Sequence, residues 1–459
     1  MTRELLVFKS KRLQIYGVAF LIAFLFLSNQ KALSQDNDSV MADEPSLSPE
    51  ISFEGEYEKS NENWYSPMKE LGITGSLRGG YWSSNRLNNN ENNLITSSTW
   101  LTLDKRLRQG LTLYADGYIY NQDTFGSESS DHRVKEIYVH FRSGDWDYRL
   151  GRQIVAWGRA DRLNPTDNLT PRDFTLLSPE IDEERMGTEA VKISKVFGMH
   201  SSITGVWLVN FEPNQLPPAN TPGLQFVHNI PEDHHQYAIK FDQSGGNVDW
   251  SISYFSGFDL NADLAITGTS GADILVQQQY NKVNVIGADL ATIVGSNRYA
   301  IEAAHTETKD SSGLDDFIKN SFMHVVVGIE RDFGNNLSAI VQGIYRKIDD
   351  YKDPREIVNE SQRAVASLGA LANHQLDKDE YGISFRVGKK WLNDTLEAEF
   401  AASTLLQRHG YAVRPKVTYS INDHLKATTG LEYFDGASDT IFGLQKNNKS
   451  AFSELRYFF

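Results

Sequence analysis

The sequence predicts an all-β fold, a transmembrane antiparallel β-barrel of about 18 strands, with 16 as the alternative count. Three observations predict it. Segments of alternating polar and apolar residues recur from Gly72 onward, short turns alternate with long polar connections, and the last segment alternates up to an aromatic residue, Phe459. Strands of about 10 residues that face lipid on one side and water on the other have this pattern.

The N-terminal region predicts export. Basic residues precede an apolar run from Leu13 to Leu27, and small residues follow at Ala32 and Ser34, so residues 1–34 are predicted to be a signal peptide. An uncleaved membrane anchor is the alternative, although a spanning helix needs roughly 20 apolar residues. Residues 35–71 are predicted to be an acidic periplasmic leader, and residues 72–459 the barrel.

Composition narrows the functions. There are 20 Tyr, 24 Phe and 34 Gly against 13 Pro, which favours a sheet protein with tight turns. The chain has 0 Cys, which excludes disulfides, thiolate metal sites and cysteine nucleophiles. The net charge of −15 argues against nucleic acid as a partner. The mean hydropathy of −0.43 is too polar for a helical membrane protein.

Alternation is clear in several segments. In residues 381–387, for example, Tyr381, Ile383 and Phe385 share one face of the predicted strand, while the intervening positions are glycine or polar. Soluble sandwiches alternate in the same way, so alternation alone does not decide between the two folds. The connections do decide, because a membrane barrel has short turns on one side and long loops on the other.

Short turns are predicted at sites such as Gln109-Gly110 and Gly295-Ser296. Long polar loops are predicted between them, at residues 85–95, 121–131, 155–187, 210–234, 258–279, 308–321, 348–379 and 435–449. Within loop 348–379, the apolar stretch from Ala364 to Leu371 predicts a short amphipathic helix that plugs the mouth or packs on its rim. An even strand count places both ends of the barrel on the periplasmic side.

The final strand carries a second signal. Leu455, Tyr457 and Phe459 are predicted to face lipid, with Glu454 and Arg456 on the inner face. The segment resembles the terminal strand that the outer-membrane assembly machinery recognises, and this resemblance makes Tyr457 and Phe459 the predicted assembly signal and that machinery a partner.

The connection 155–187 is the candidate functional element. With the strand before it, it holds charged residues that are predicted to face one another across a narrowed opening, and such a transverse field filters solutes by charge and size. The predicted constriction residues are Arg152, Arg159, Asp161, Arg162, Asp167, Arg172 and Asp173. Two placements stay open: an inward constriction, or an external lid in which these charges pair with one another.

A family resemblance rests on the same segment. Gly151-Arg152-Gln153, Trp157-Gly158-Arg159 and Asn164-Pro165-Thr166-Asp167 resemble outer-membrane barrels related to alginate-export and substrate-specific porins. The position after the fifth predicted strand resembles that of the constriction loop of general porins. The resemblance implies a channel, without a set of substrate-binding residues.

Later strands place basic residues on the predicted inner face: Arg386, Arg414, Lys416, Lys426 and Arg456. A basic ladder would favour an anionic solute such as a uronate, phosphate or carboxylate. Acidic residues, including Glu399 and Glu432, offset them, so ordinary solvated charge is the alternative.

The predicted function is a passive channel, a porin or export pore in the outer membrane, for small hydrophilic solutes that are anionic or carbohydrate in nature. It is not predicted to be an enzyme. The alternatives are an enzyme at the membrane face, with Ser201 by His200 or Asp423 by His424, and an occluded receptor or structural barrel. No cofactor or metal is predicted. Partners are outer-membrane lipid and lipopolysaccharide, the solute, and two further copies in a homotrimer.

Overall fold

The computed structural model describes residues 65–84, 93–123, 130–216, 222–232 and 234–459. The predicted signal peptide and the predicted leader up to residue 64 lie outside these residues. The chain divides into two compact units, Met1–Ile73 and Thr74–Phe459. In the first, a short helix α2 covers Ser66–Glu70. No helix in the described part of the chain is both long enough and apolar enough to cross a membrane.

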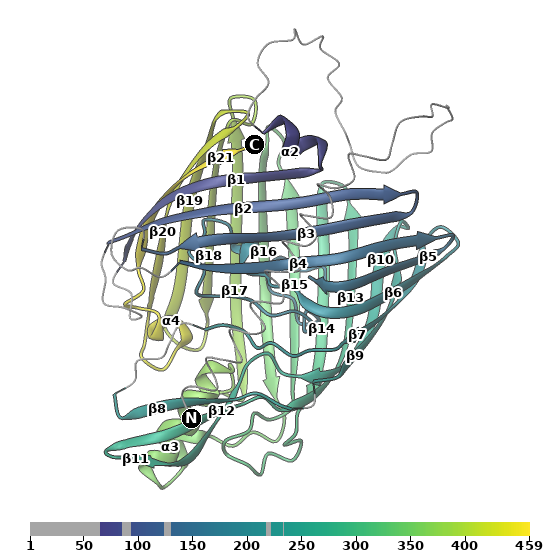
Figure 1. Ribbon diagram of the computed structural model, residues 1–459. Helices are drawn as coiled ribbons and strands as arrows, with labels where there is room; N and C mark the ends of the chain where they lie inside the picture. The colour runs from purple at the N-terminus through teal and green to yellow at the C-terminus, as the bar shows by residue number, and fades with distance from the viewer. Residues whose placement is uncertain (1–64, 85–92, 124–129, 217–221, 233) are drawn as a thin grey trace. The chain divides into compact units, whose positions relative to one another are not determined.

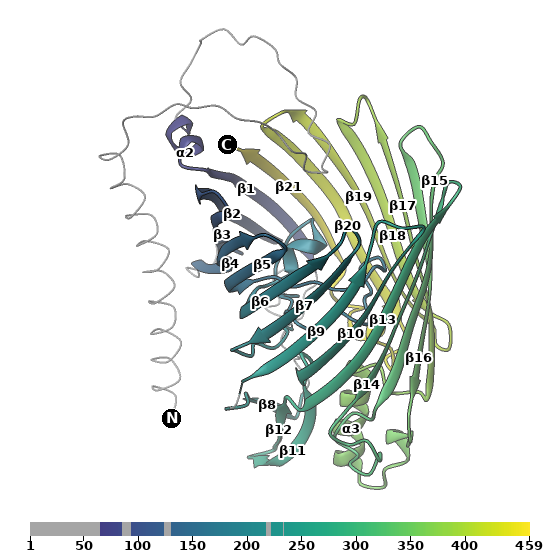
Figure 2. The same cartoon turned by 90° about the vertical axis from the view of Figure 1, so that its right-hand side faces the viewer.

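The second unit is a closed antiparallel barrel (Figures 1 and 2). Each barrel strand pairs with the next barrel strand along the chain, and β21 pairs with β1. The predicted fold class and the count of 18 strands are confirmed. The barrel strands are β1 (Ile73–Ser84), β2 (Asn93–Arg108), β3 (Leu111–Asn121), β4 (Ser130–Ser143), β5 (Trp146–Gln153), β6 (Thr188–Phe197), β7 (Ser201–Leu208), β9 (Gln236–Gln243), β10 (Val248–Phe258), β13 (Lys282–Val294), β14 (Asn297–Glu307), β15 (Phe322–Asp332), β16 (Leu337–Ile348), β17 (Asp379–Trp391), β18 (Leu396–Leu405), β19 (Gly410–Asn422), β20 (Leu425–Gly436) and β21 (Ser450–Phe458).

Side chains alternate between an apolar outer face and a polar inner face. On β13 and β14, Ile286 and Ile301 are exposed on the outside, whereas Asp289 and Glu302 are buried on the opposite face. An isolated barrel that exposes a belt of apolar side chains has the outer surface that a lipid bilayer requires. The inner face is therefore polar. Its charged side chains form ion pairs with residues that are distant in the sequence.

Turn chemistry explains why one end of the barrel is compact. Gly110 and Gly295 have φ of 74° and 62°, the left-handed region that glycine enters without steric strain. Asn393 and Asp394 occupy the same region at the β17–β18 turn, as short polar side chains tolerate. The tight turns predicted between these strands are thus present, and they leave the long connections together at the opposite end.

The long connections are not all irregular, which corrects the prediction of plain polar loops at 210–234 and 258–279. They contain β8 (Leu224–Asn229), β11 (Asp263–Ser270) and β12 (Asp273–Gln279), which form a separate three-stranded sheet. The predicted helix exists as α3, Glu360–Ala372, and contacts β11. Val276 and Val365 are fully buried in the core between sheet and helix. This cap gathers at the long-loop end of the barrel (Figure 1).

Three short helical turns complete the described elements: η2 (Ile181–Glu184), η3 (Pro354–Glu356) and α4 (Ile441–Leu444).

The closing seam corrects one prediction. Phe459 was expected to face lipid, but it is only 6% exposed. Its backbone exchanges two hydrogen bonds of 3.1 Å with Gly75, and its ring fills the space where a Gly75 side chain would lie. Leu455 and Tyr457 keep the outward parity of the strand, and Leu455 is 49% exposed. The terminal aromatic residue therefore also packs the seam that closes the barrel.

Candidate lumen constriction

Loop 155–187 lies inside the barrel and contacts inner-face residues around most of its circumference. It leaves β5, meets β13 and β14, then β17 to β19, and finally β21 and β1 before it enters β6. Of the two placements that the sequence left open, these contacts agree with the inward one.

The first part of the loop is anchored by apolar packing. Val155, Trp157 and Leu169 are 4%, 7% and 2% exposed. They join a buried cluster with inner-face residues of the neighbouring strands: Ala190, Val206, Leu208, Ala238, Phe255, Val283, Val285 and Ala304. An apolar patch on the inner wall of a membrane barrel is unusual, and here it has a partner in the loop. The hydrophobic effect therefore holds this part of the loop against the wall.

A buried carboxylate organises the same segment. Glu302 of β14 has no exposed surface. Its Oε1 accepts hydrogen bonds from the Thr166 backbone N–H (2.9 Å) and hydroxyl (2.8 Å). Its Oε2 accepts from the backbone N–H of Arg159 (2.9 Å) and Ala160 (3.1 Å) and from the Asn164 amide (3.2 Å). Five donors from one loop converge on one side chain.

Gly158 makes this arrangement possible. Its φ is +100°, and a Cβ there would lie 2.5 Å and 2.6 Å from the two Glu302 carboxylate oxygens. A residue with a side chain would therefore meet both backbone strain and a direct clash. The motif Trp157-Gly158-Arg159 with Asn164-Pro165-Thr166 thus has a physical meaning: it forms a turn that encloses the carboxylate of Glu302.

Charged side chains extend from this turn to the wall. Arg159 donates to Asp289 at 2.6 Å and to Asp242 at 3.0 Å. Asp161 accepts two bonds from Arg386, at 2.9 Å and 2.7 Å. Arg162, whose φ is 65°, donates to Glu399 at 3.2 Å. The tip of the loop is therefore tied to β17 and β18, across the lumen from its origin on β5.

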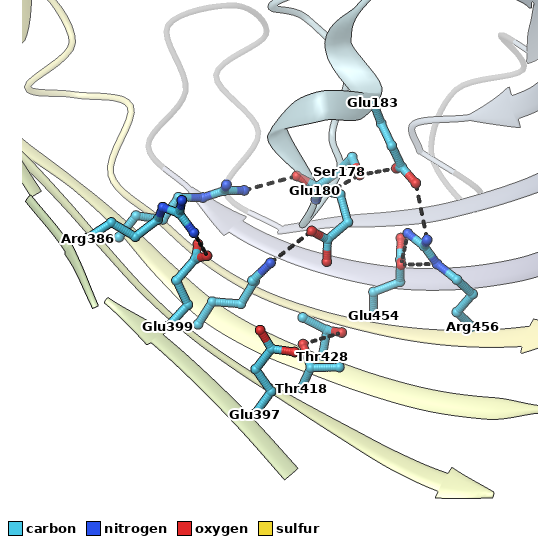
Figure 3. Close-up of polar contacts among 12 residues, drawn as sticks. Ser178, Glu180, Glu183, Arg386, Glu397, Glu399, Thr418, Thr428, Glu454 and Arg456 are labelled. Atoms are coloured by element: carbon cyan, nitrogen blue, oxygen red, sulfur yellow. Dashed lines mark hydrogen bonds and ion pairs between the residues drawn. The ribbon is translucent and has the colours of Figure 1, made fainter. Parts of the chain in front are cut away.

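The second part of the loop reaches the basic wall of the last strands (Figure 3). Glu180 pairs with Lys416 at 2.9 Å, and Glu183 accepts from Arg456 at 3.1 Å and from Arg78 at 2.7 Å. The Ser178 carbonyl accepts from Arg414 at 3.1 Å. The loop thus brings two carboxylates to the predicted basic ladder, which they neutralise in part.

The predicted basic residues are otherwise paired within the wall. Arg414 lies 3.0 Å from Glu432, and Arg456 lies 2.9 Å from Glu454. Lys426 lies over the ring of Phe458, 5.4 Å from its centroid. Charges of both signs therefore alternate along this wall, in agreement with the solvated-charge alternative rather than with a continuous cationic track.

A cavity of about 300 Å³ adjoins the loop tip. Its lining includes Asp161, Arg162, Asp182, Arg185 and Arg386. Carboxylates and guanidinium groups thus meet in one water-accessible space whose size suits a small solute.

The predicted constriction residues do not act as one set. Arg159, Asp161 and Arg162 reach the wall as described. Asp167 and Arg172 instead hold the loop's own structure: Asp167 lies 2.6 Å from Arg185 and 3.7 Å from Arg172. Asp173 accepts from Thr175 within the loop and lies 3.9 Å from Arg133 of β4. The expected field between these arginines and aspartates is wrong in detail, because Arg159, Asp161 and Arg162 pair with wall residues that sequence spacing does not reveal.

The prediction that Arg152 lies in the constriction is wrong. It lies opposite Ile137 and Glu189, two residues from the exposed outer-face residue Leu150, and so has the outward parity of β5. Its guanidinium pairs with Glu189 at 3.1 Å and Glu212 at 2.6 Å near the long-loop end. It braces the rim rather than the lumen.

One loop carboxyl has a perturbed affinity for protons. Burial raises the pKa of Glu184 to about 7, against the opposing effect of the nearby Arg172 and Arg414. The backbone carbonyl of the same residue accepts from the Asp173 N–H at 2.7 Å. Its ionisation therefore changes the charge next to a loop contact in the neutral pH range.

The residues of the enzyme alternative lie at the compact end. The Ser201 hydroxyl donates to Gln243 at 2.6 Å, and a His424 ring nitrogen lies 3.2 Å from the Phe458 carbonyl. Within the described ranges, no group of three His, Asp or Glu side chains is placed to hold a metal ion.

Comparisons with known proteins agree with this architecture. A family model described as "Protein of unknown function (DUF1302)" matches residues 65–457. No curated protein matches the sequence.

Among solved structures, the outer-membrane protein OpdK of Pseudomonas aeruginosa is similar with a TM-score of 0.53 at 7% identity, over 84% of this chain and 98% of its own. OccD3 of the same organism is similar with a TM-score of 0.52 at 10% identity, over 84% of this chain and 91% of its own. OccAB1 of Acinetobacter baumannii is similar with a TM-score of 0.52 at 8% identity, over 84% of this chain and 96% of its own. The fold is that of outer-membrane porins.

Proposed function

Because the family match covers most of the chain, the protein belongs to the DUF1302 family, and we propose that it is an outer-membrane channel for passive passage of small hydrophilic solutes, narrowed by loop 155–187. One observation carries the proposal. The loop contacts inner-face residues of strands on opposite sides of an 18-stranded barrel, and barrels of 16 to 18 strands leave an aqueous path.

The charges around the loop indicate what passes. Asp161, Glu180 and Glu183 pair with Arg386, Lys416 and Arg456, so the lumen presents fixed charges of both signs. Such a lining solvates polar molecules without strongly excluding either ion. We therefore propose that solutes are selected by size and hydrogen bonding, with a weak preference by charge, and that sugars and small carboxylates both enter.

Solute flux tests this function. The protein, purified from membranes and placed in liposomes, is expected to cause swelling in isotonic arabinose and more slowly in a disaccharide, with potassium gluconate close to arabinose. Empty liposomes are the control. Rates equal to those of empty liposomes for every solute would reject the channel and favour an occluded barrel.

Subunit number follows from the same preparation. We propose a homotrimer, as the sequence interpretation expected, and chemical crosslinking in detergent at several protein concentrations is expected to give a limiting species of three chains. A limiting monomer would reject the trimer and leave the channel unaffected.

A further inference from the structure

We infer that Glu302, a residue of the barrel wall, is the positioning residue that sets the opening of the channel by holding the turn 158–166. This inference rests on the proposed function, because it assigns the element that fixes the width of the proposed path. No part of the sequence motif points to Glu302, which lies more than one hundred residues further along the chain.

The number and kind of donors carry the inference. A carboxylate has about four lone-pair sites, and Glu302 accepts from five donors: three backbone N–H groups, one amide and one hydroxyl. Among the described residues, no cation forms an ion pair with it. Hydrogen bonds to a buried charge are stronger than those between neutral groups, and leaving such a charge unpaired is costly.

Two further contacts with the barrel wall stabilise the turn 158–166. Arg298, four residues before Glu302 on the same face of β14, donates to the Arg159 carbonyl at 2.9 Å. The methyl group of Thr166 lies against Gly287 of β13, where a Cβ would approach it to 2.5 Å. The turn therefore packs against a glycine of the wall and is hydrogen-bonded to β14 at both of its ends.

The alternative anchors are weaker. Asp161 and Arg162 pair with the wall through side chains that are 21% and 27% exposed, and partly solvated ion pairs of this kind contribute little. Arg159 reaches the buried Asp289, but through a single hydrogen bond of 2.6 Å. The apolar cluster of Val155, Trp157 and Leu169 holds the segments on either side of the turn, whereas Glu302 holds the turn itself. Glu302 is thus a fully buried wall residue that accepts five hydrogen bonds from the loop.

The test uses the absence of cysteine from the chain. Leu169→Cys, in the loop at a position that is 2% exposed against the wall, reports whether the loop is docked through its rate of labelling by a charged methanethiosulfonate. Adding Glu302→Gln is expected to raise that rate about tenfold or more, because an amide of equal size turns N–H groups toward the loop donors. Glu307→Gln, at an exposed position on the same strand, is the matched control and is expected to leave the rate unchanged.

Conductance gives the second readout without any cysteine. Glu302→Gln alone is expected to show larger and noisier single-channel steps than the wild type, with the heat-modifiable electrophoretic mobility of a folded barrel retained. An unchanged labelling rate together with unchanged steps would overturn the inference. If the Leu169→Cys/Glu302→Gln variant is labelled rapidly but neither it nor the wild type conducts, the positioning role of Glu302 is supported and the channel function is rejected.

Discussion

The two parts of loop 155–187 are held in the lumen by different forces. Residues 155–169 are fixed by buried apolar side chains and by the carboxylate of Glu302, which has no exposed surface. Residues 178–185 are held mainly by ion pairs of unequal exposure: the Glu180 side chain is 42% exposed, whereas that of Glu183 is 16% exposed. Because salt screens exposed pairs far more than buried ones, the first part is expected to be a fixed support and the second an adjustable edge.

The largest effect is expected at the fixed support. Gly158→Ala places a Cβ against the Glu302 carboxylate and adds backbone strain of about 1 kcal/mol at positive φ. Single-channel conductance is expected to rise, as for Glu302→Gln. Gly198→Ala is the matched control, because Gly198 has φ +60° but open space around it. Equal behaviour of the two variants would show that the crowding at Glu302 is unimportant.

At the adjustable edge, removing charge is expected to alter selectivity more than width. Glu183→Gln leaves Arg78 and Arg456 without the carboxylate between them. The chloride-to-potassium permeability ratio, from the reversal potential in a salt gradient, is expected to rise about two- to fivefold. Glu356→Gln, in the η3 turn far along the chain, should leave the ratio unchanged. A ratio that falls or stays constant in Glu183→Gln would contradict a neutralised basic wall.

The edge is also expected to respond to pH. The folded-state pKa of Glu184, about 7, exceeds the ordinary glutamate value, so the docked loop favours the protonated form. Its stabilising contribution is complete below the unfolded pKa and is lost as pH rises to the folded pKa. Channel openings are therefore expected to become more frequent as pH rises from about 4.5 to about 7, the interval between the unfolded and folded pKa values. Glu184→Gln should abolish that dependence, and the same dependence in the variant would assign it to another group.

The smallest effect is expected for a partly exposed pair near the tip. Arg386→Gln removes the bonds to Asp161, but the arginine and aspartate side chains are 31% and 21% exposed. Such a pair contributes about 0.5 kcal/mol, so labelling of Leu169→Cys should change by less than about threefold. A change as large as that of Glu302→Gln would show that this partly exposed ion pair anchors the turn as strongly as Glu302 does.

Periodicity predicted most of the fold. The barrel, its strand number and its turns depend on local alternation and on residues such as Gly110 and Asn393, whose conformational preferences are visible in sequence. Strand β8 escaped prediction because it pairs with β12, which lies in another connection. Strands β11 and β12 form a local hairpin, which the prediction of a plain polar loop at 258–279 missed. Nothing local in Leu224–Asn229 shows that it will lie parallel to β12.

The site was predicted less completely. The loop and its charged residues were recognisable, but their partners were not, since Glu302 and Asp289 look like ordinary inner-face acids of their strands. Parity would have corrected Arg152, because counting two residues from Leu150 assigns it to the outer face. The Gly158 motif signalled a constrained turn, and only the structure supplies the carboxylate that the turn encloses.

The most direct test of the account is single-channel conductance in a planar bilayer, with wild-type protein and a variant lacking residues 158–184 measured side by side. If the loop spans and narrows the lumen, both proteins conduct, and the deletion gives larger, steadier steps whose ion selectivity shifts toward anions as Glu180 and Glu183 are removed. Steps of equal size and selectivity in two folded, heat-modifiable barrels would show that the loop does not limit the path and would contradict the central claim.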